Sequence, residues 1–169
     1  MREATDYKEA VEFCKRCDYC TIEPWGTSID HLRLTVIGKE GTPYANGKFI
    51  FEIKFPKDYP NMPPYFYCAT KMWHPNIDSS KPPGRLNMSV DLLDVNYINF
   101  TWGWRPPFSN LKDAIEATIS LIHLKKRIMG LTLNPKAEKQ YRSNPEKFER
   151  KARDFTRKYA IESFFIKNK

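Results

Sequence analysis

The segment at residues 70–93, TKMWHPNIDSSKPPGRLNMSVDLL, has the residue types of an active-site corner. His74, Pro75 and Asn76 join a rigid turn to two polar side chains, and a proline-glycine loop leads from them into an apolar run. Ser89 is the only hydroxyl in that run. A serine without an assisting base is a poor nucleophile because its pKa is far above that of a thiol, and no triad base is evident beside it.

All four cysteines lie before this corner, at Cys14, Cys17, Cys20 and Cys68. The first three have a C-x2-C-x2-C spacing that could bind a metal, but the chain has no second CxxC and no His-x3-His pair to complete a site. We therefore expect no metal and no cofactor. Instead, Cys14 and Cys17 are predicted to lie on adjacent turns of the first helix, and Cys68 on a strand.

Composition and charge indicate a soluble, folded chain. Its 169 residues are 41% hydrophobic and 28% charged, which suits one ordinary domain. No apolar run approaches the ~20 residues that span a bilayer, and the N-terminus carries charges where a signal peptide is apolar. The net charge of +8 is concentrated in the last third, where acidic residues are interleaved. That mixture is typical of a solvated helix face, so nucleic acid is not an expected partner.

Regular elements flank the corner on both sides. Apolar periodicity predicts a helix at 3–20, and alternating patterns then predict strands that short turns join into an antiparallel meander. The predicted strands are 31–37, 48–55 and 65–69.

No further regular element is predicted until Asn110, and a connection of this length is usually functional. Asn110 is predicted to cap a helix at 111–126. This helix has one apolar stripe, and its basic residues lie at the C-terminal end, where the helix dipole favours positive charge. Two more helices are predicted at 135–142 and 145–164, separated by Ser143-Asn144-Pro145.

Several motifs, in order, resemble the ubiquitin-conjugating enzyme family. The stretch TPYANGKFIFEIKFPKDYPNMPP is similar to the family's T-P-Y turn and its strand ending in F-P-x-x-Y-P-x-x-P-P, and TKMWHPNI to its H-P-N-I segment. Trp104-Arg105-Pro106 resembles the family's W-S-P, and ARDFTRKYA its closing A-R-x-[WF]-T-x-K-Y-A. These matches span about residues 30 to 160.

The resemblance implies an α+β UBC-like fold with an N-terminal helix, an antiparallel β-meander, a long active-site loop, a central helix and C-terminal helices. One domain would cover residues 1–169, with a core at about 3–160 and a short C-terminal extension at 161–169. The implied activity is to accept ubiquitin or a ubiquitin-like modifier from an activating enzyme and to transfer it to a lysine. The implied partners are the modifier, the activating enzyme and a ubiquitin ligase, in the cytoplasm and/or nucleus.

The resemblance also assigns roles to residues near the corner. Asn76 takes the place of the asparagine that stabilises the oxyanion during transfer. His74 would hold the loop by hydrogen bonding rather than act as a base, and Pro75 would anchor it. Trp104 is implied to be structural at the site.

The family's nucleophile is a cysteine, and this chain has none at that place. Matching the apolar residues puts Ser89 at the cysteine position, whereas counting from the preceding glycine puts Asn87 there, as the lesser option. With Ser89 there, two interpretations remain open. The chain is a Cys-to-Ser form of a conjugating enzyme, inactive or very slow as given, or it is a catalytically inactive variant that acts as a scaffold or partner subunit.

Overall fold

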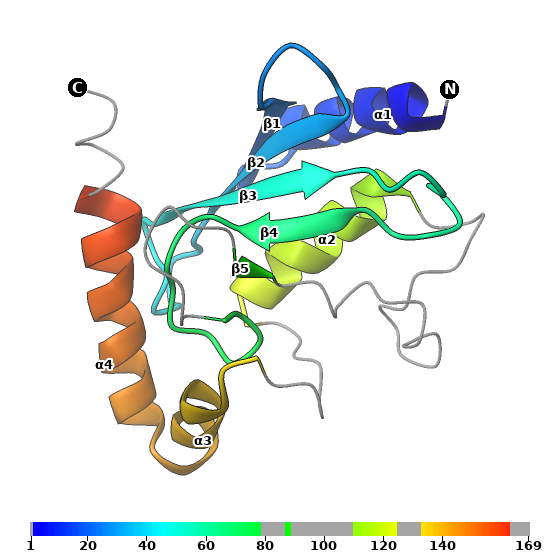
Figure 1. The fold of residues 1–169 in the computed structure, drawn as a ribbon. Coiled ribbons are helices and arrows are strands. Elements are labelled where there is room, and N and C mark those ends of the chain that lie inside the picture. Colours follow the sequence, from blue (N-terminus) through cyan, green and yellow to red (C-terminus); the bar gives the residue numbers. More distant parts are fainter. Residues whose placement is uncertain (1, 79–86, 89–109, 125–132, 163–169) are drawn as a thin grey trace.

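The computed structural model of the chain describes residues 2–78, 87–88, 110–124 and 133–162 (Figure 1). Its architecture is α+β, with an N-terminal helix, an antiparallel sheet and C-terminal helices, as predicted. The elements, in chain order, are α1 (Arg2–Arg16), β1 (Cys20–Pro24), β2 (His31–Ile37), β3 (Lys48–Lys54), β4 (Tyr65–Cys68), β5 (Asn87–Met88), α2 (Leu111–Ile122), α3 (Pro135–Ser143) and α4 (Pro145–Phe155).

The sheet has the strand order β1-β2-β3-β4-β5, and every neighbouring pair is antiparallel. Leu34 of β2 lies opposite both Ile22 of β1 and Phe51 of β3. Leu34 and Phe51 are completely buried, because side chains alternate across a strand and those of one face enter the core. Strands β2, β3 and β4 confirm the predicted meander to within one residue at each end.

Helix α2 supplies the other side of the core. In Figure 1 it lies behind β4 and β5, and its apolar stripe is buried. Asn110 caps it as predicted: the Asn110 side chain accepts a hydrogen bond from the Asp113 N–H at 3.0 Å, and the Asp113 carboxylate accepts one from the Asn110 N–H at 3.1 Å. The helix ends at Ile122 rather than at residue 126, because Leu124 takes a left-handed conformation with φ 57°.

The N-terminal part differs from the prediction. Helix α1 stops at Arg16, so Cys17 follows the helix and Cys20 begins the unpredicted strand β1. Pairing with β2 explains this strand, since Cys20 lies opposite Val36 and the Ile37 N–H donates to the Tyr19 carbonyl at 2.8 Å. A five-residue segment ending in proline has a weak local strand signal, but a proline is tolerated on an edge strand.

The segment after Thr70 was also more regular than expected, since β5 pairs with β4. At the C-terminal end, α3 and α4 confirm the two predicted helices, but α4 ends at Phe155 and continues as a π-helical turn, η3 (Thr156–Glu162), instead of reaching residue 164 as an α-helix. Asn134 and Asn144 cap α3 and α4 through their side chains.

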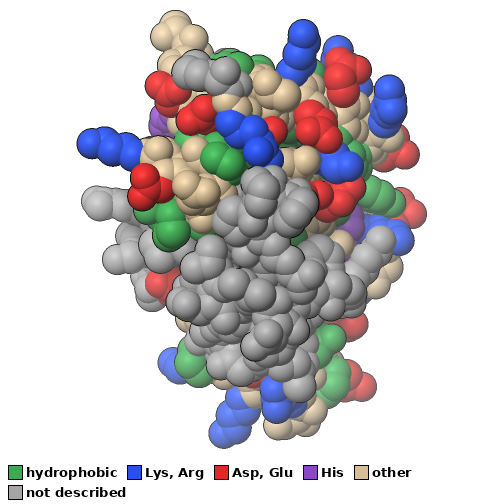
Figure 2. Space-filling model, turned by 90° about the vertical axis from the view of Figure 1, so that its right-hand side faces the viewer, with side chains coloured by type: hydrophobic (Ala, Val, Ile, Leu, Met, Phe, Trp, Pro, Cys, Tyr) green, Lys and Arg blue, Asp and Glu red, His purple; other side chains and the backbone are tan. Residues whose placement is uncertain are grey.

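The charged surface is mixed on the face shown in Figure 2, where Lys and Arg side chains alternate with Asp and Glu and hydrophobic groups are small and separate. None of the helices described is both long and apolar enough to cross a membrane.

Candidate active site

The corner at residues 74–76 is held to the end of α2 by its histidine. His74 is completely buried, and its Nε2 lies 2.8 Å from the Leu121 carbonyl oxygen. Its Nδ1 accepts a hydrogen bond from the backbone N–H of Asn76 at 3.0 Å. A carbonyl can only accept and an amide N–H can only donate, so the imidazole is neutral with its proton on Nε2. Both ring nitrogens are therefore occupied within the fold.

Two further segments hold the corner through backbone atoms. The Tyr44 hydroxyl, on the turn between β2 and β3, donates to the Trp73 carbonyl at 2.7 Å. The backbone N–H of Asn134, at the start of α3, donates to the Pro75 carbonyl at 3.1 Å. Tyr44 is completely buried, and this burial raises the pKa of its phenol well above the ordinary value. The corner is thus fixed from three directions before any ligand binds.

Asn76 stands at the end of this bonded corner with only 6% of its surface exposed. Its backbone is positioned by the bond to His74, so its side chain starts from a fixed Cα. An amide held in this way could stabilise an oxyanion without reorganising during the reaction. The oxyanion role of Asn76 and the anchoring roles of His74 and Pro75 stay predictions, and the contacts are of the kind those roles require.

The predicted nucleophile lies at the edge of what the structure describes. Ser89 and Trp104 fall outside the described residues. Asn87, the lesser option, is in β5, where its backbone lies opposite Cys68 of β4. Because β5 ends at Met88, Ser89 is the next residue along the chain.

All four cysteines lie within the described residues, and three of them, Cys14, Cys20 and Cys68, are buried. Cys68 is completely buried, its Sγ donates to the Thr70 carbonyl at 3.0 Å, and burial raises the pKa of its thiol to about 12. At neutral pH only about one molecule in 10⁵ would carry a Cys68 thiolate. The Sγ atoms of Cys14 and Cys20 lie 2.8 Å apart in the core, where the Cys14 thiol, followed by burial, raises the pKa of Cys20. Burial also raises the pKa of Cys17.

Metal ligands are not gathered in this part of the molecule. Within residues 2–78, 87–88, 110–124 and 133–162, no three His, Cys, Asp or Glu side chains are arranged to hold a metal ion.

Sequence reasoning assigned no role at the corner to Tyr44, Leu121 or Asn134. Tyr44 belongs to the quoted T-P-Y motif, which could have indicated it. Leu121 and Asn134 act through backbone atoms, so their residue types carry no signal of the contact.

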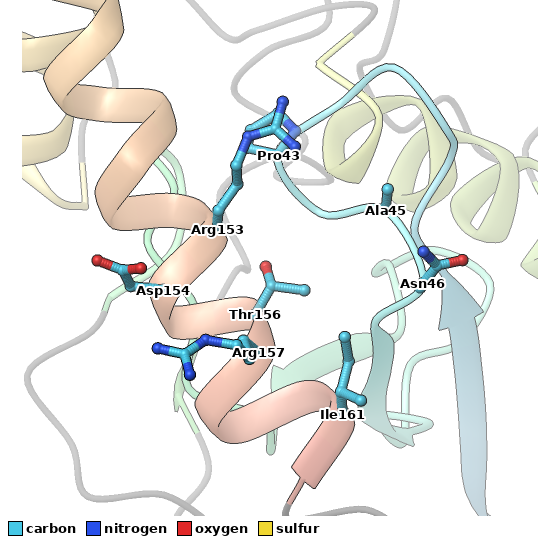
Figure 3. Close-up of a pocket in the computed structure, with 8 residues that line it drawn as sticks. All are labelled: Pro43, Ala45, Asn46, Arg153, Asp154, Thr156, Arg157 and Ile161. Atoms are coloured by element: carbon cyan, nitrogen blue, oxygen red, sulfur yellow. The ribbon is translucent and has the colours of Figure 1, made fainter.

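A cavity of about 290 Å³ lies elsewhere, between the β2–β3 turn and the C-terminal helices (Figure 3). Pro43 and Ala45 line it from the turn, and Arg153, Thr156 and Ile161 line it from α4 and η3. Among the described lining residues there is no His74, Pro75 or Asn76.

Comparison with known proteins gives consistent matches. The sequence profile described as "Ubiquitin-conjugating enzyme" matches residues 2–156. The chain is 35% identical over 138 residues to the NEDD8-conjugating enzyme ubc-12 of Caenorhabditis elegans, and the aligned part covers 80% of this chain and 71% of that protein.

Two solved structures share the fold. One, described as a ubiquitin conjugating enzyme from Plasmodium yoelii, has a TM-score of 0.73 and 22% identity, and the match covers 95% of this chain and 96% of that one. The other is the E2 domain of a Toxoplasma gondii ubiquitin conjugating enzyme, with a TM-score of 0.72, 23% identity and coverage of 94% and 99%.

Proposed function

Because the chain belongs to the ubiquitin-conjugating enzyme family, we propose that residue 89 accepts ubiquitin or a ubiquitin-like modifier from an activating enzyme and that the chain passes it to a lysine. The observation that carries the proposal is the buried corner, in which His74 Nδ1 holds the Asn76 N–H at 3.0 Å. Acyl transfer needs a preorganised donor where negative charge develops on the carbonyl oxygen. The Asn76 side chain is the donor in this proposal.

The proposed transfer has two steps, first to Ser89 and then to a lysine. The Ser89 oxygen attacks the thioester carbonyl that joins the modifier to the activating enzyme, so a C–O bond forms, the C–S bond breaks and the proton leaves with the thiol. A lysine amine then attacks the oxyester, forms the amide and releases the Ser89 hydroxyl. An oxyester is a less reactive acyl donor than a thioester, so transfer by the chain as given is slow or absent, as expected of a Cys-to-Ser form.

A second function is supported by the state of the cysteines. Cys68 is the cysteine nearest the corner in sequence, and burial with a pKa of about 12 makes it unsuitable as a replacement nucleophile. A family member without a reactive thiol could instead act as a catalytically inactive scaffold or partner subunit. Whether residue 89 accepts a modifier distinguishes the two functions.

The partners in this proposal follow from the family. The C. elegans relative is described as NEDD8-conjugating, so NEDD8 is a candidate modifier beside ubiquitin. A ubiquitin ligase is the expected partner for transfer, and Met62, a large hydrophobic residue with 41% of its surface exposed, is a candidate contact. The proposed place of action is the cytoplasm and/or the nucleus.

The test compares the chain as given with Ser89→Cys. Each is incubated with ATP, a matched activating enzyme and either ubiquitin or NEDD8, and the products are separated with and without reducing agent. We expect Ser89→Cys to form a reducible adduct and the given chain to form none, or a slow adduct that resists reduction but is cleaved by base.

Three further variants locate the nucleophile. Cys68→Ser, made in the Ser89→Cys background, should load normally because the buried thiol takes no part. Asn76→Ala in that background should load but discharge to lysine about 10²-fold more slowly, the cost of losing one oxyanion donor. If no modifier loads either Ser89→Cys or Asn87→Cys, the enzyme proposal fails and the scaffold remains. If Asn87→Cys loads instead, the nucleophile position is wrong.

A further inference from the structure

Four lysines from three segments lie near one another, and one of them, Lys151, covers the buried ring of Trp73. Lys71 comes from the segment that leads to the corner, Lys136 from α3, and Lys147 and Lys151 from α4, and we call them the lysine cluster. The Nζ of Lys151 lies 3.7 Å from the centre of the Trp73 ring. Burial lowers the pKa of Lys151, and the charges of the other three lysines lower it further, because ammonium groups repel at close range.

A row of aromatic rings forms the floor of the lysine cluster. The ring centres of Trp73 and Phe155 lie 5.6 Å apart, and those of Phe155 and Tyr159 lie 5.4 Å apart. Lys71 Nζ lies 5.8 Å and 5.7 Å from the centres of Phe155 and Tyr159. Trp73 is 4% exposed and donates from Nε1 to Gln140 Oε1 at 2.9 Å, so this floor is fixed.

The lysine cluster has no neutralising partner in the described part of the chain, where no carboxylate oxygen lies within 4.0 Å of any of its four ammonium groups. Some basic residues elsewhere in the described part are paired: Arg142 bonds Glu138 on α3, and Lys15 bonds Glu12 on α1. Figure 2 shows Lys and Arg side chains next to Asp and Glu side chains on the face it displays. Repulsion between like charges disfavours a cluster of this kind, and a bound anion would relieve it.

We propose that the lysine cluster binds an acidic segment of a protein partner, whose carboxylates contact Lys71 from one side and Lys147 and Lys151 of α4 from the other. The lysine cluster begins only three residues before His74 in sequence, so the partner would dock beside the corner. This binding does not require transfer at residue 89.

The same geometry argues against nucleic acid as the ligand. Single strands bind basic grooves by stacking their bases on aromatic rings, and here Trp73 is buried beneath Lys151. A long polyanion would also meet the exposed carboxylates of α4, which lie at Glu146, Glu149 and Asp154. A short run of acidic side chains can contact the lysine cluster and avoid them.

The test measures binding of a fluorescein-labelled oligo-glutamate peptide to the full chain by fluorescence anisotropy at low ionic strength. The double variant Lys147→Gln/Lys151→Gln keeps most of each side-chain stem and removes two charges of the lysine cluster. The matched control Lys8→Gln/Lys57→Gln removes two exposed charges from α1 and the β3–β4 turn. We expect the first pair to weaken binding about tenfold and the control pair to leave it within about twofold.

The remaining arms make the proposal refutable. Lys71→Gln, outside α4, is a second variant and should also weaken binding, and chemical unfolding should show that neither cluster variant is destabilised, since repulsion is removed. Equal weakening by the control pair, or equal binding of oligo-glutamine, would show that net charge or the peptide backbone is responsible and would overturn the proposal. Tighter binding of single-stranded oligo-thymidine, lost in the cluster variants, would assign the lysine cluster to nucleic acid and also overturn it. Failure of the wild-type chain to bind oligo-glutamate would do the same.

Discussion

Replacement of His74 by alanine should destabilise the fold by about 1.5–4.5 kcal/mol. The backbone N–H of Asn76 would lose its acceptor in a buried place, which costs roughly 1–3 kcal/mol. The Leu121 carbonyl would lose one donor but keep the Leu124 N–H at 3.0 Å, so this loss is only about 0.5–1.5 kcal/mol. For a chain of this size the sum corresponds to a fall in Tm of about 3–18 °C.

Two conservative variants separate these contributions. His74→Asn keeps an acceptor near the position of Nδ1, and His74→Gln keeps a donor that can reach the Leu121 carbonyl. Because Leu121 has a second donor, we expect the order of stability to be wild type, then asparagine, then glutamine, then alanine.

Urea unfolding followed by circular dichroism measures the free energies, with the slope m compared between variants to confirm that the same surface unfolds. A loss below about 0.5 kcal/mol for His74→Ala, within the range of ordinary surface substitutions, would refute the account of the corner. A glutamine variant more stable than the asparagine variant would show that the bond to α2, and not the bond to Asn76, dominates.

Three further predictions concern other parts of the fold. The buried carboxylate of Asp6 accepts hydrogen bonds from Arg2 Nε at 3.0 Å and from the Tyr59 hydroxyl. Asp6→Asn and Tyr59→Phe should therefore each lower the free energy of unfolding in urea by about 1–3 kcal/mol. If the loss in the double variant equals the sum of the two single losses, their direct contact is contradicted. Since the pKa of the Cys68 thiol is raised from 9.0 to about 12 in the folded chain, the unfolded chain loses this proton first as pH rises. The free energy of unfolding should therefore fall by up to ~1.4 kcal/mol per pH unit between these two pKa values, and less steeply in Cys68→Val. Equal pH slopes of the free energy of unfolding in the two proteins would refute this prediction. Asn110→Ala should cost about 1 kcal/mol by removing the α2 cap, measured by thermal unfolding against Lys112→Ala on the same helix, and an equal effect of both would contradict a specific cap.

Local pattern was sufficient for the strands and helices with strong periodicity. In β3, alternation between the faces is a property of the backbone and needs no partner to be recognised. Asn110 indicated the start of α2 because a capping side chain bonds the backbone only three residues further on. Strand β1 was missed because five residues ending in Pro24 have little local preference, and their strand conformation comes from pairing with β2.

In the candidate site, too, the residue types could be read from the sequence and their contacts could not. The sequence located His74, Pro75 and Asn76, but the atoms that hold them belong to Tyr44 and to the backbones of Leu121 and Asn134. Those partners lie 29 to 59 positions away in the chain, and backbone acceptors have no residue-type signature.

The sequence by itself determined the order of the family motifs and the absence of any cysteine after Cys68. It also showed basic residues mixed with acidic ones near the C-terminus, which suggested a solvated helix face. Only the tertiary structure decided that burial raises the pKa of Cys68 to about 12, and that Lys71 joins Lys147 and Lys151 over an aromatic floor. Burial and charge repulsion act through space between segments distant in sequence, so their effects on a thiol or an ammonium group appear only once the chain has folded.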